Sequence, residues 1–322
     1  MGGRFAAETA VLAAKQGHYV GEELLALGIA GKTGLAIELA ARFDAQIISA
    51  DAVAVYRGMD IGTAKPDHEE RSRIPHHLID ILNPDEPYDA ARFAGDVSAI
   101  IQNLAKEGKN AFVVGGTGLY IKALLYGLME KGRSDKTVRD RLRCELEQKG
   151  AKAMHERLAA LDPAAAQRIH VNDAFRIVRA MEICELTGRP AAALRDEHGF
   201  SRPRYRALFF CLKLDRQTLY GRINRRVEQM VAQGLVGEVR SLMDKGCGPE
   251  LKSMQAIGYR HMVRHVLGEI SLDEAVSLTQ RDTRRFAKRQ LTWFAAMPGI
   301  TWVEPDKAEL MAELIAAHLN KP

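Results

Sequence analysis

The chain has 322 residues, of which 47% are hydrophobic and 27% charged, and its formal net charge is +5. Hydrophobic cores stop growing near about 250 residues, so this length indicates two domains, or one domain with a large insertion. The composition is ordinary for a folded soluble protein, and no stretch approaches the roughly 20 apolar residues of a membrane span. We therefore expect a folded protein that does not cross a membrane.

The cysteines and the first residues restrict the cellular compartment. The four cysteines are Cys144, Cys184, Cys211 and Cys247. They form no CxxC pair, which argues against a zinc site or a disulfide framework. The first 25 residues include Glu8, Lys15 and Glu22 and lack an uninterrupted apolar core, so we expect no secretory signal. These features favour a cytoplasmic protein with reduced thiols.

Helical and strand patterns alternate in the first part of the chain. Apolar residues at helical spacing run from Leu35 to Phe43, and residues 46–50 read as a short buried strand that ends at Asp51. A second helix is predicted over residues 89–107. This order is typical of an α/β protein.

A second buried strand at residues 110–114 runs straight into Gly115-Gly116-Thr117-Gly118 and a helical pattern from Leu119. The alternation predicts a parallel sheet with helices on both faces. Ligand loops of such sheets lie at the carboxyl ends of the strands, so we expect Asp51 and Thr117 on one rim.

The rest of the chain divides into a helical stretch and a return of strand pattern. Residues 134–187 read as helix almost throughout, whereas residues 205–212 and 300–303 read as strands with amphipathic helices between them. The domains that we expect are an α/β core (residues 1–133), a helical insertion (134–200) and the remainder of the core with basic helices (201–322).

Gly31-Lys32-Thr33 before a helical pattern is the second half of the P-loop motif GxxxxGK[ST]. In this motif backbone amides cradle phosphates, the lysine neutralises them and the hydroxyl binds Mg²⁺. The core would then be P-loop NTPase-like, a type that binds nucleotides such as ATP, with Thr33 as the metal ligand. The expected diphosphate site comprises Gly28, Ile29, Ala30, Gly31, Lys32 and Thr33.

The first half of the motif departs from the pattern, because Ala26 stands at the position of the leading glycine. Residues 18–25 also make a poor buried strand, since they include Gly21, Glu22 and Glu23. The alternative is a helix start without a ligand, because glycine, lysine and threonine are all common at helix termini.

Basic residues crowd residues 201–226, where Asp215 is the only acid. An anionic partner would fit this stretch, and the alternative is a solvated basic face that binds nothing.

Seven short motifs are spread along the chain. They are ISAD (48–51), YRGMDIGTAKP (56–66), IPHHLID (74–80), VGGTGLY (114–120), RIHVND (168–173), QAIGY (255–259) and TRRFAKRQLTWF (283–294). In sequence and in order they resemble the signature of bacterial tRNA dimethylallyltransferases. The resemblance covers the chain from about Ala26 to Trp302.

This resemblance implies transfer of a dimethylallyl group from dimethylallyl diphosphate to the exocyclic amine of the adenosine adjacent to the anticodon, in tRNAs that read codons starting with U. Asp51 would orient the amine and accept its proton. Lys32, Arg222 and a Mg²⁺ ion would stabilise the diphosphate leaving group, and Thr117 would hold the reacting end. The alternatives are a helix cap for Asp51, a tight turn for Thr117 and a solvated arginine for Arg222, for which Arg226 is a rival.

The partner implied by the resemblance is the anticodon stem-loop of tRNA, whose target base must be led out of the loop into a channel. The implied contacts are Asp51, Ala52, Val53, Ala54, Thr117, Arg139, Phe175, Arg176, Ile177, Val178, Arg179, Gln255, Gly258, Tyr259, Arg260, Lys288, Arg289 and Gln290. A solvated face is the alternative for each basic residue among them. We expect a monomer.

Several positions depart from the family pattern. Ala52 replaces a serine, Ala54 replaces a glutamine, and Phe175 replaces a glutamine that usually reads the flipped nucleotide. Together with Ala26 they favour an alternative function, a tRNA-binding homologue with impaired catalysis. A small-metabolite kinase would explain Gly31-Lys32-Thr33 but not residues 289–294.

Overall fold

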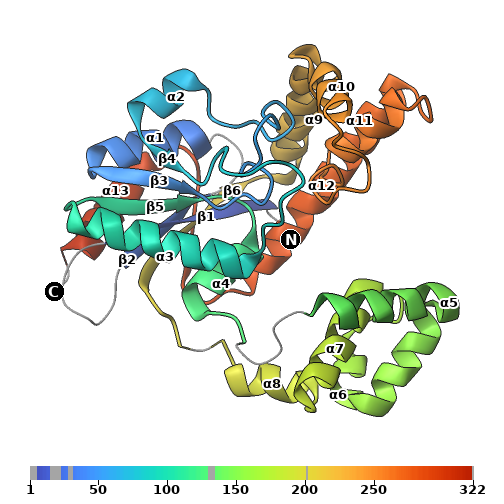
Figure 1. The fold of residues 1–322 in the computed structure, drawn as a ribbon. Coiled ribbons are helices and arrows are strands. Elements are labelled where there is room, and N and C mark those ends of the chain that lie inside the picture. The colour runs from blue at the N-terminus through green and yellow to red at the C-terminus, as the bar shows by residue number, and fades with distance from the viewer. Residues whose placement is uncertain (1–5, 15–22, 28–31, 130–134, 201, 321–322) are drawn as a thin grey trace. The chain divides into compact units, whose positions relative to one another are not determined.

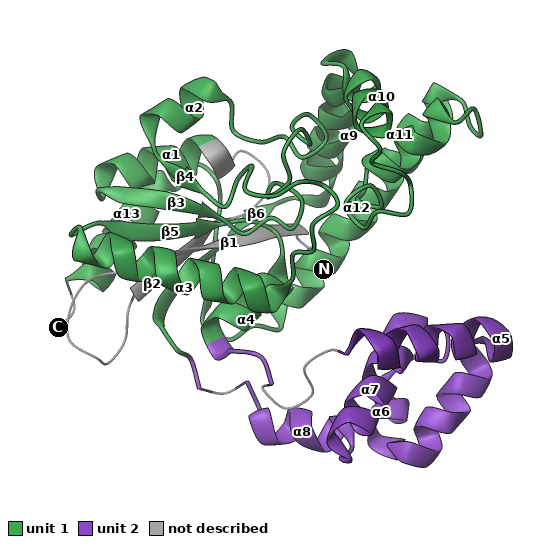
Figure 2. Ribbon diagram, in the orientation of Figure 1, with its two compact units in different colours: residues 1–125, 204–322 green, residues 126–203 purple. Residues whose placement is uncertain are grey.

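The computed structural model describes residues 6–14, 23–27, 32–129, 135–200 and 202–320. Two compact units divide the chain (Figure 2). Unit 1 comprises Met1–Leu125 and Arg204–Pro322, and unit 2 comprises Tyr126–Pro203. Unit 2 therefore interrupts unit 1 in the sequence.

A seven-stranded sheet forms the centre of unit 1. Its strands are β1 (Ala6–Ala14), β2 (Glu23–Leu27), β3 (Ala45–Ser49), β4 (His76–His77), β5 (Asn110–Val114), β6 (Arg206–Leu214) and β7 (Ile300–Val303). They lie in the order β4-β3-β5-β1-β2-β6-β7. The pairs β3–β4, β3–β5, β2–β5, β2–β6 and β6–β7 are parallel, so the expected parallel sheet is confirmed for these strands.

β1 differs from the expectation, because it runs antiparallel to β2, β5 and β6. Parallel neighbours need a crossover of a dozen or more residues, and only residues 15–22 separate β1 from β2. β2 also covers part of the segment that the sequence disfavoured as a strand, and Ala26 pairs there with Val113.

Helices cover both faces of the sheet, with α1 and α3 on opposite faces (Figure 1). Those of unit 1 are α1 (Lys32–Arg42), α2 (His68–Arg73), α3 (Ala90–Lys106), α4 (Gly118–Tyr126), α9 (Arg216–Ala232), α10 (Leu235–Asp244), α11 (Tyr259–Val266), α12 (Leu272–Ala295) and α13 (Ala308–Leu319). α3 shows why such helices form. Its N-cap Asp89 accepts hydrogen bonds from the Ala91 and Arg92 amides, and Phe93 and Val97 lie one turn apart on its buried face.

Unit 2 is helical, as the sequence predicts for residues 134–187. It contains α5 (Lys136–Leu161), α6 (Pro163–Arg168), α7 (Ala174–Thr187) and α8 (Ala191–His198). α5 is kinked at Gly150, whose φ of 79° lies in the left-handed region that favours glycine. Leu142, Met154, Leu158 and Met181 belong to a separate hydrophobic core in this unit.

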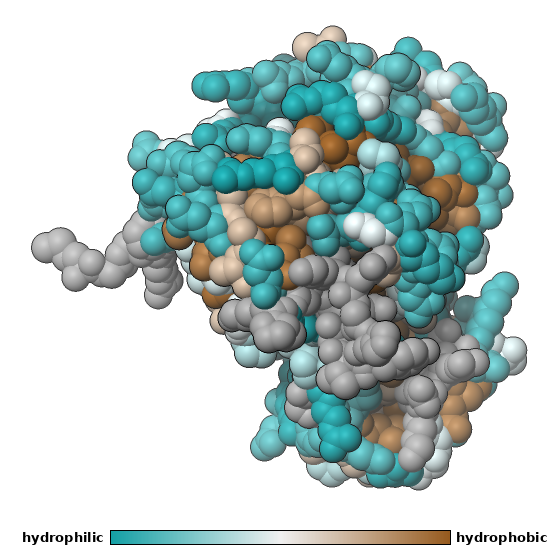
Figure 3. Space-filling view, turned by 90° about the vertical axis from the view of Figure 1, so that its left-hand side faces the viewer, coloured by the Kyte–Doolittle hydropathy of each residue, from teal (hydrophilic) through white to brown (hydrophobic). Residues whose placement is uncertain are grey.

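The face in Figure 3 is mostly hydrophilic, with hydrophobic residues in small patches between hydrophilic ones. Within the part of the chain that the structure describes, no helix is long and apolar enough to cross a membrane.

Candidate active site

Asp51 lies two residues after the end of β3, at the carboxyl end of a fully buried strand. Its Oδ1 atom accepts hydrogen bonds from the Val53 amide at 2.8 Å and the Ala54 amide at 3.1 Å. This turn fixes the carboxylate against its own backbone. Among the described residues, no hydrogen-bond donor contacts Oδ2.

The loop after β5 is attached to the Asp51 turn by three hydrogen bonds. The Ala50 amide donates to the Val114 carbonyl at 2.8 Å, and the Thr117 amide donates to the Ala50 carbonyl at 3.1 Å. The Thr117 hydroxyl accepts from the Ala52 amide at 3.1 Å. The structure thus places Asp51 and Thr117 on one rim of the sheet.

Two glycines allow this close approach. A Cβ atom on Gly115 would lie 2.3 Å from the Ala50 carbonyl carbon, so no larger residue fits without moving the backbone. A Cβ on Gly118 would lie 2.5 Å from the Trp293 ring. Glycine is required at both positions for packing rather than for a positive φ.

α12 packs against the loop after β5. The Gln290 side chain is buried, and its Nε2 donates to the Gly116 carbonyl at 2.7 Å. Together with Trp293 on Gly118, this contact joins residues 290–293 to the Thr117 loop. Gln290 therefore supports the loop.

The alanines that depart from the family pattern leave this geometry intact. Ala52 and Ala54 contribute backbone amides to the turn, and their side chains take no part in its hydrogen bonds. Ala54 is buried, while Ala52 and Val53 are partly buried. A serine or glutamine side chain is therefore not needed to hold Asp51 in place.

Gly28, Ile29, Ala30 and Gly31, part of the expected diphosphate loop, lie outside the described residues. Lys32 and Thr33 form the start of α1, as the motif predicts, and the positions of their side chains lie outside the description. Among the described residues there is no cluster of three or more His, Cys, Asp or Glu side chains that could hold a metal ion.

Glu238 organises the loop that follows Asp51, which the sequence did not predict. Its carboxylate accepts hydrogen bonds from the Asp60, Ile61 and Gly62 amides at 2.8, 2.7 and 3.1 Å. The Tyr259 hydroxyl donates to the same carboxylate at 2.6 Å. Glu238 therefore joins α10 and α11 to the loop.

Tyr259 has no exposed surface, so its ring supports this loop and is not accessible to a nucleic acid. A Cβ on Gly62 would lie 2.5 Å from that ring, which explains the glycine in the motif. Burial, followed by the charge and hydrogen bond of Glu238, raises the pKa of Tyr259 far above its usual value. The hydroxyl therefore stays protonated and keeps donating.

Lys65 fixes the other end of the loop from a side chain that is only 2% exposed. Its Nζ donates to the Tyr56 carbonyl and Asp60 at 2.6 Å and to Asp80 at 2.5 Å. Burial alone would raise the pKa of Asp80, but the hydrogen bonds and charges of Lys65 and Arg71 lower it. The buried lysine is thus paired with carboxylates, as a buried charge requires.

The basic residues expected at the site lie on α9, α11 and α12. Arg222 is exposed on α9, and Lys288 and Arg289 are exposed on α12. Arg260 donates to Asp282 at 2.6 Å. Gln255 is exposed, and its side chain donates to the Pro249 carbonyl at 2.5 Å. Gly258 is the N-cap of α11 and has a φ of 94°.

In unit 2 the expected contact residues divide into buried and exposed ones. Ile177 and Val178 are buried in the core of that unit. Arg139 and Arg179 both donate to the Glu182 carboxylate, at 3.0 and 2.7 Å.

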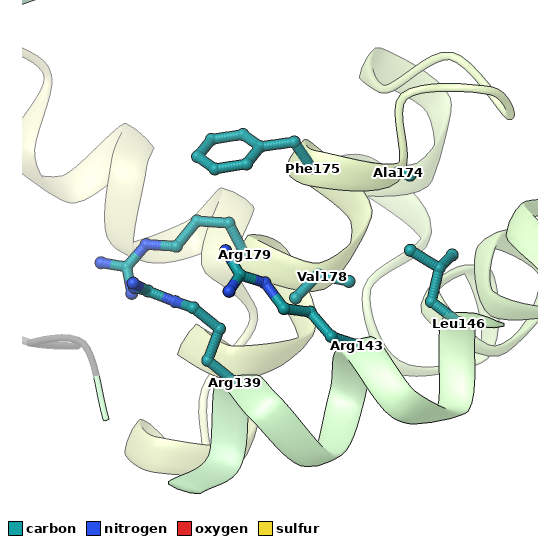
Figure 4. Close-up of a pocket in the computed structure, with 7 residues that line it drawn as sticks. All are labelled: Arg139, Arg143, Leu146, Ala174, Phe175, Val178 and Arg179. Atoms are coloured by element: carbon teal, nitrogen blue, oxygen red, sulfur yellow. The ribbon is translucent and has the colours of Figure 1, made fainter. Parts of the chain in front are cut away.

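Phe175 and Arg176 are exposed at the start of α7. Figure 4 shows the Phe175 ring above the guanidinium groups of Arg139, Arg143 and Arg179.

A comparison with family models shows to which family the chain belongs. The model of the IPP transferase family matches residues 54–297. The chain belongs to the IPP transferase family. The match includes the loop after Asp51, the β5 loop with Thr117 and the α12 motif.

Individual relatives of this family cover most of the chain. A tRNA dimethylallyltransferase of Desulfatibacillum aliphaticivorans is 54% identical over 290 residues, which are 90% of this chain and 95% of that protein. One from Desulfosudis oleivorans is 52% identical over 274 residues, covering 85% and 87%. The full-length tRNA isopentenylpyrophosphate transferase of Bacillus halodurans shares the fold, with a TM-score of 0.68 and 38% identity over 91% of this chain and 95% of that one.

Proposed function

We propose that the protein is a tRNA dimethylallyltransferase, which transfers the dimethylallyl group of dimethylallyl diphosphate to the exocyclic amine of the adenosine adjacent to the anticodon. The substrates are tRNAs that read codons starting with U. The observation that carries this proposal is the rim of the sheet, where Asp51 and the Thr117 hydroxyl are held by one hydrogen-bond network. The relatives that are about half identical support catalysis and give no support to the alternative of a tRNA-binding homologue with impaired catalysis.

At the acceptor end, Asp51 orients the adenine amine and takes its proton. A new bond forms between the amine nitrogen and the allylic carbon, while the bond from that carbon to the diphosphate oxygen breaks. The amine proton moves to Asp51 Oδ2, and pyrophosphate leaves with the bonding electrons. Oδ1 is already engaged by two backbone amides, so the carboxylate is oriented before the substrate binds.

At the donor end, residues 28–31, Lys32, Thr33 and Arg222 bind the diphosphate. A Mg²⁺ ion at Thr33 would neutralise the charge that develops on the leaving group. Lys32 and Arg222 add fixed positive charge for the same purpose. Thr117 holds the end of the loop against the Asp51 turn.

Contacts to the tRNA come from both units. In unit 1 the candidates are Arg260, Lys288, Arg289 and Gln255, and Gln290, Gly258 and Tyr259 support the loops. In unit 2 they are Arg139, Arg176 and Arg179, with Phe175. We propose that the protein acts as a cytoplasmic monomer.

The test is label transfer from radioactive dimethylallyl diphosphate, with Mg²⁺, to two unmodified tRNAs. One carries adenosine as the third anticodon base and as the following base. The matched control carries guanosine as the third anticodon base. We expect label in the first tRNA and about background in the second, and equal label in both or in neither would contradict the proposal.

A further inference from the structure

The segment that follows β4 runs beside the turn that contains Asp51. The Asp80 amide donates to the Ala54 carbonyl at 3.2 Å, and the Ile81 amide donates to the Val55 carbonyl at 2.9 Å. The Ala54 amide in turn donates to Asp51 Oδ1 at 3.1 Å. Ala54 is therefore bonded to Asp51 through its amide and to Asp80 through its carbonyl.

The backbone of this segment has an uncommon conformation. Leu78 has a φ of 60° and Asp80 a φ of 57°, and both values lie in the left-handed region that residues other than glycine rarely adopt. Aspartate tolerates this region better than leucine, and Leu78 is buried. Such a conformation persists only where the surrounding contacts enforce it. The position of Asp80 therefore depends on its tertiary contacts.

Two cations anchor the Asp80 side chain. Its Oδ1 accepts from Lys65 Nζ at 2.5 Å, and its Oδ2 accepts from Arg71 Nη1 at 2.7 Å. Lys65 Nζ also donates to the Tyr56 carbonyl and to Asp60 Oδ1, both at 2.6 Å. An ammonium group has three N–H donors, and these three acceptors take all of them. Because the Lys65 side chain is only 2% exposed, water does not readily replace a lost partner.

Resting on the proposed function, we propose that Lys65 is a positioning residue for Asp51 and acts through Asp80. The ammonium holds the Asp80 carboxylate, the Asp80 amide holds the Ala54 carbonyl, and the Ala54 amide holds Asp51 Oδ1. A base must lie within hydrogen-bond reach of the proton that it accepts, so its rate falls when its orientation varies. Lys65 thus acts on the reaction through the geometry of the turn.

Asp60 offers a matched comparison within the same cluster. Asp60 and Asp80 are both bound to Lys65 Nζ, at 2.6 and 2.5 Å. The Asp80 amide donates to Ala54, whereas the Asp60 amide donates to Glu238. Asparagine at either position removes one negative charge beside the ammonium. A difference between the two variants therefore reports the link to the turn and not the loss of charge.

The first measurement is hydrogen exchange of the Val53 and Ala54 amides, which donate to Asp51, in the full-length protein without substrate. We expect Asp80→Asn to speed their exchange by about 10-fold or more, because the turn opens locally more often. Asp60→Asn should change it by less than about 3-fold. The amides of β5 serve as an internal reference, since their exchange reports the wider unfolding of unit 1.

The second measurement is single-turnover prenyl transfer, with the binding of tRNA and of dimethylallyl diphosphate measured separately. Asp80→Asn should lower the transfer rate on the order of 10-fold and leave both dissociation constants within about 2-fold of the unaltered protein. Asp60→Asn should keep the rate within about 2-fold. Lys65→Met removes the ammonium and should lower the rate at least as much as Asp80→Asn. If the Lys65→Met protein does not fold, Asp80→Asn alone decides the test.

Unchanged exchange of the two amides in Asp80→Asn would overturn the inference. Equal effects of Asp80→Asn and Asp60→Asn would overturn it too, because the ion cluster would then only stabilise the fold.

The proposed function fails independently of this inference. Faster amide exchange in Asp80→Asn, without any prenyl transfer by the unaltered protein, would overturn the transferase and leave the link from Lys65 to the turn standing. Prenyl transfer by the unaltered protein, with an unchanged rate in Asp80→Asn, would do the reverse.

Discussion

The Thr117 hydroxyl accepts a hydrogen bond from the Ala52 amide at 3.1 Å, which ties the loop after β5 to the residue that follows Asp51. From this bond we infer that Thr117 is a positioning residue for Asp51. Thr117→Val keeps the shape but removes the acceptor, and we expect kcat to fall on the order of 10- to 100-fold through misplacement of the turn. Thr117→Ser keeps the hydroxyl and should retain most of the activity. Activity retained in Thr117→Val but lost in Thr117→Ser in a prenyl-transfer assay would show that the methyl group matters and the hydroxyl does not.

The approach of Gly115 to Ala50 gives a second prediction. A Cβ on Gly115 would overlap the Ala50 carbonyl, so Gly115→Ala should lower the free energy of unfolding by about 2 kcal/mol or more. The matched control is Gly95→Ala in α3, where a Cβ meets nothing within 4 Å. It should stabilise the protein by about 0.5–1 kcal/mol, because alanine is the better helix former. Urea unfolding measures the stability of both variants, and equal changes in their free energies of unfolding would refute the steric explanation.

The contacts of Glu238 predict that replacing it by a neutral side chain of the same size lowers the stability of the fold. Glu238→Gln removes the charge that three amides and the Tyr259 hydroxyl share, and we expect it to lower the free energy of unfolding by about 2 kcal/mol. Tyr259→Phe removes one of the four bonds and should cost about 1 kcal/mol. Glu313→Gln, at an exposed position of α13, serves as control. A Glu238→Gln protein as stable as this control would exclude the proposed support of the loop.

Asp282 predicts a dependence of stability on pH. Burial would raise its pKa, but hydrogen bonds and charges from Arg281 and Arg260 lower it to about 2. This value lies below the unfolded value of about 3.9, so the stabilisation is complete above pH 4 and is lost as pH falls toward 2. After screening by solvent, Asp282→Asn should cost on the order of 1 kcal/mol at pH 7.

Urea unfolding of the unaltered protein and of Asp282→Asn from pH 7 to pH 3 checks this prediction. The difference between their free energies of unfolding should narrow below pH 4. A difference that stays constant over the whole range would mean that the Asp282 charge does not stabilise the fold.

The sequence predicted that Asp51 and Thr117 lie on one rim of the sheet because the signals for this are local. Residues 46–50 and 110–114 are buried strands, and each is followed by the polar or glycine-rich residues that strand ends carry. Parallel strands bring such ends together, so the sequence alone places Asp51 and Thr117 on one rim. The helical insertion was visible for the same reason, since helical periodicity appears within a few turns.

The contacts of Glu238 could not be predicted in this way. They join residues that are 176 to 178 positions apart, and a glutamate on an amphipathic helix looks like any solvated residue. The one available signal was Gly62, whose missing side chain leaves space for the Tyr259 ring. Tyr259 was expected to contact tRNA, and the structure buries it because the same ring supports the loop. The antiparallel β1 was missed because the first 25 residues carry no clear strand pattern.

In the proposed reaction, Asp51 accepts the proton of the adenine amine. The direct test is a single-turnover prenyl-transfer assay with Asp51→Asn, which keeps the size of the side chain, and with Asp85→Asn, an exposed aspartate, as control. We predict a rate about 100- to 10,000-fold lower for Asp51→Asn, with tRNA binding within a few-fold of the unaltered protein and no change for Asp85→Asn. A rate for Asp51→Asn within a few-fold of the unaltered protein would contradict the assignment of Asp51 as the base.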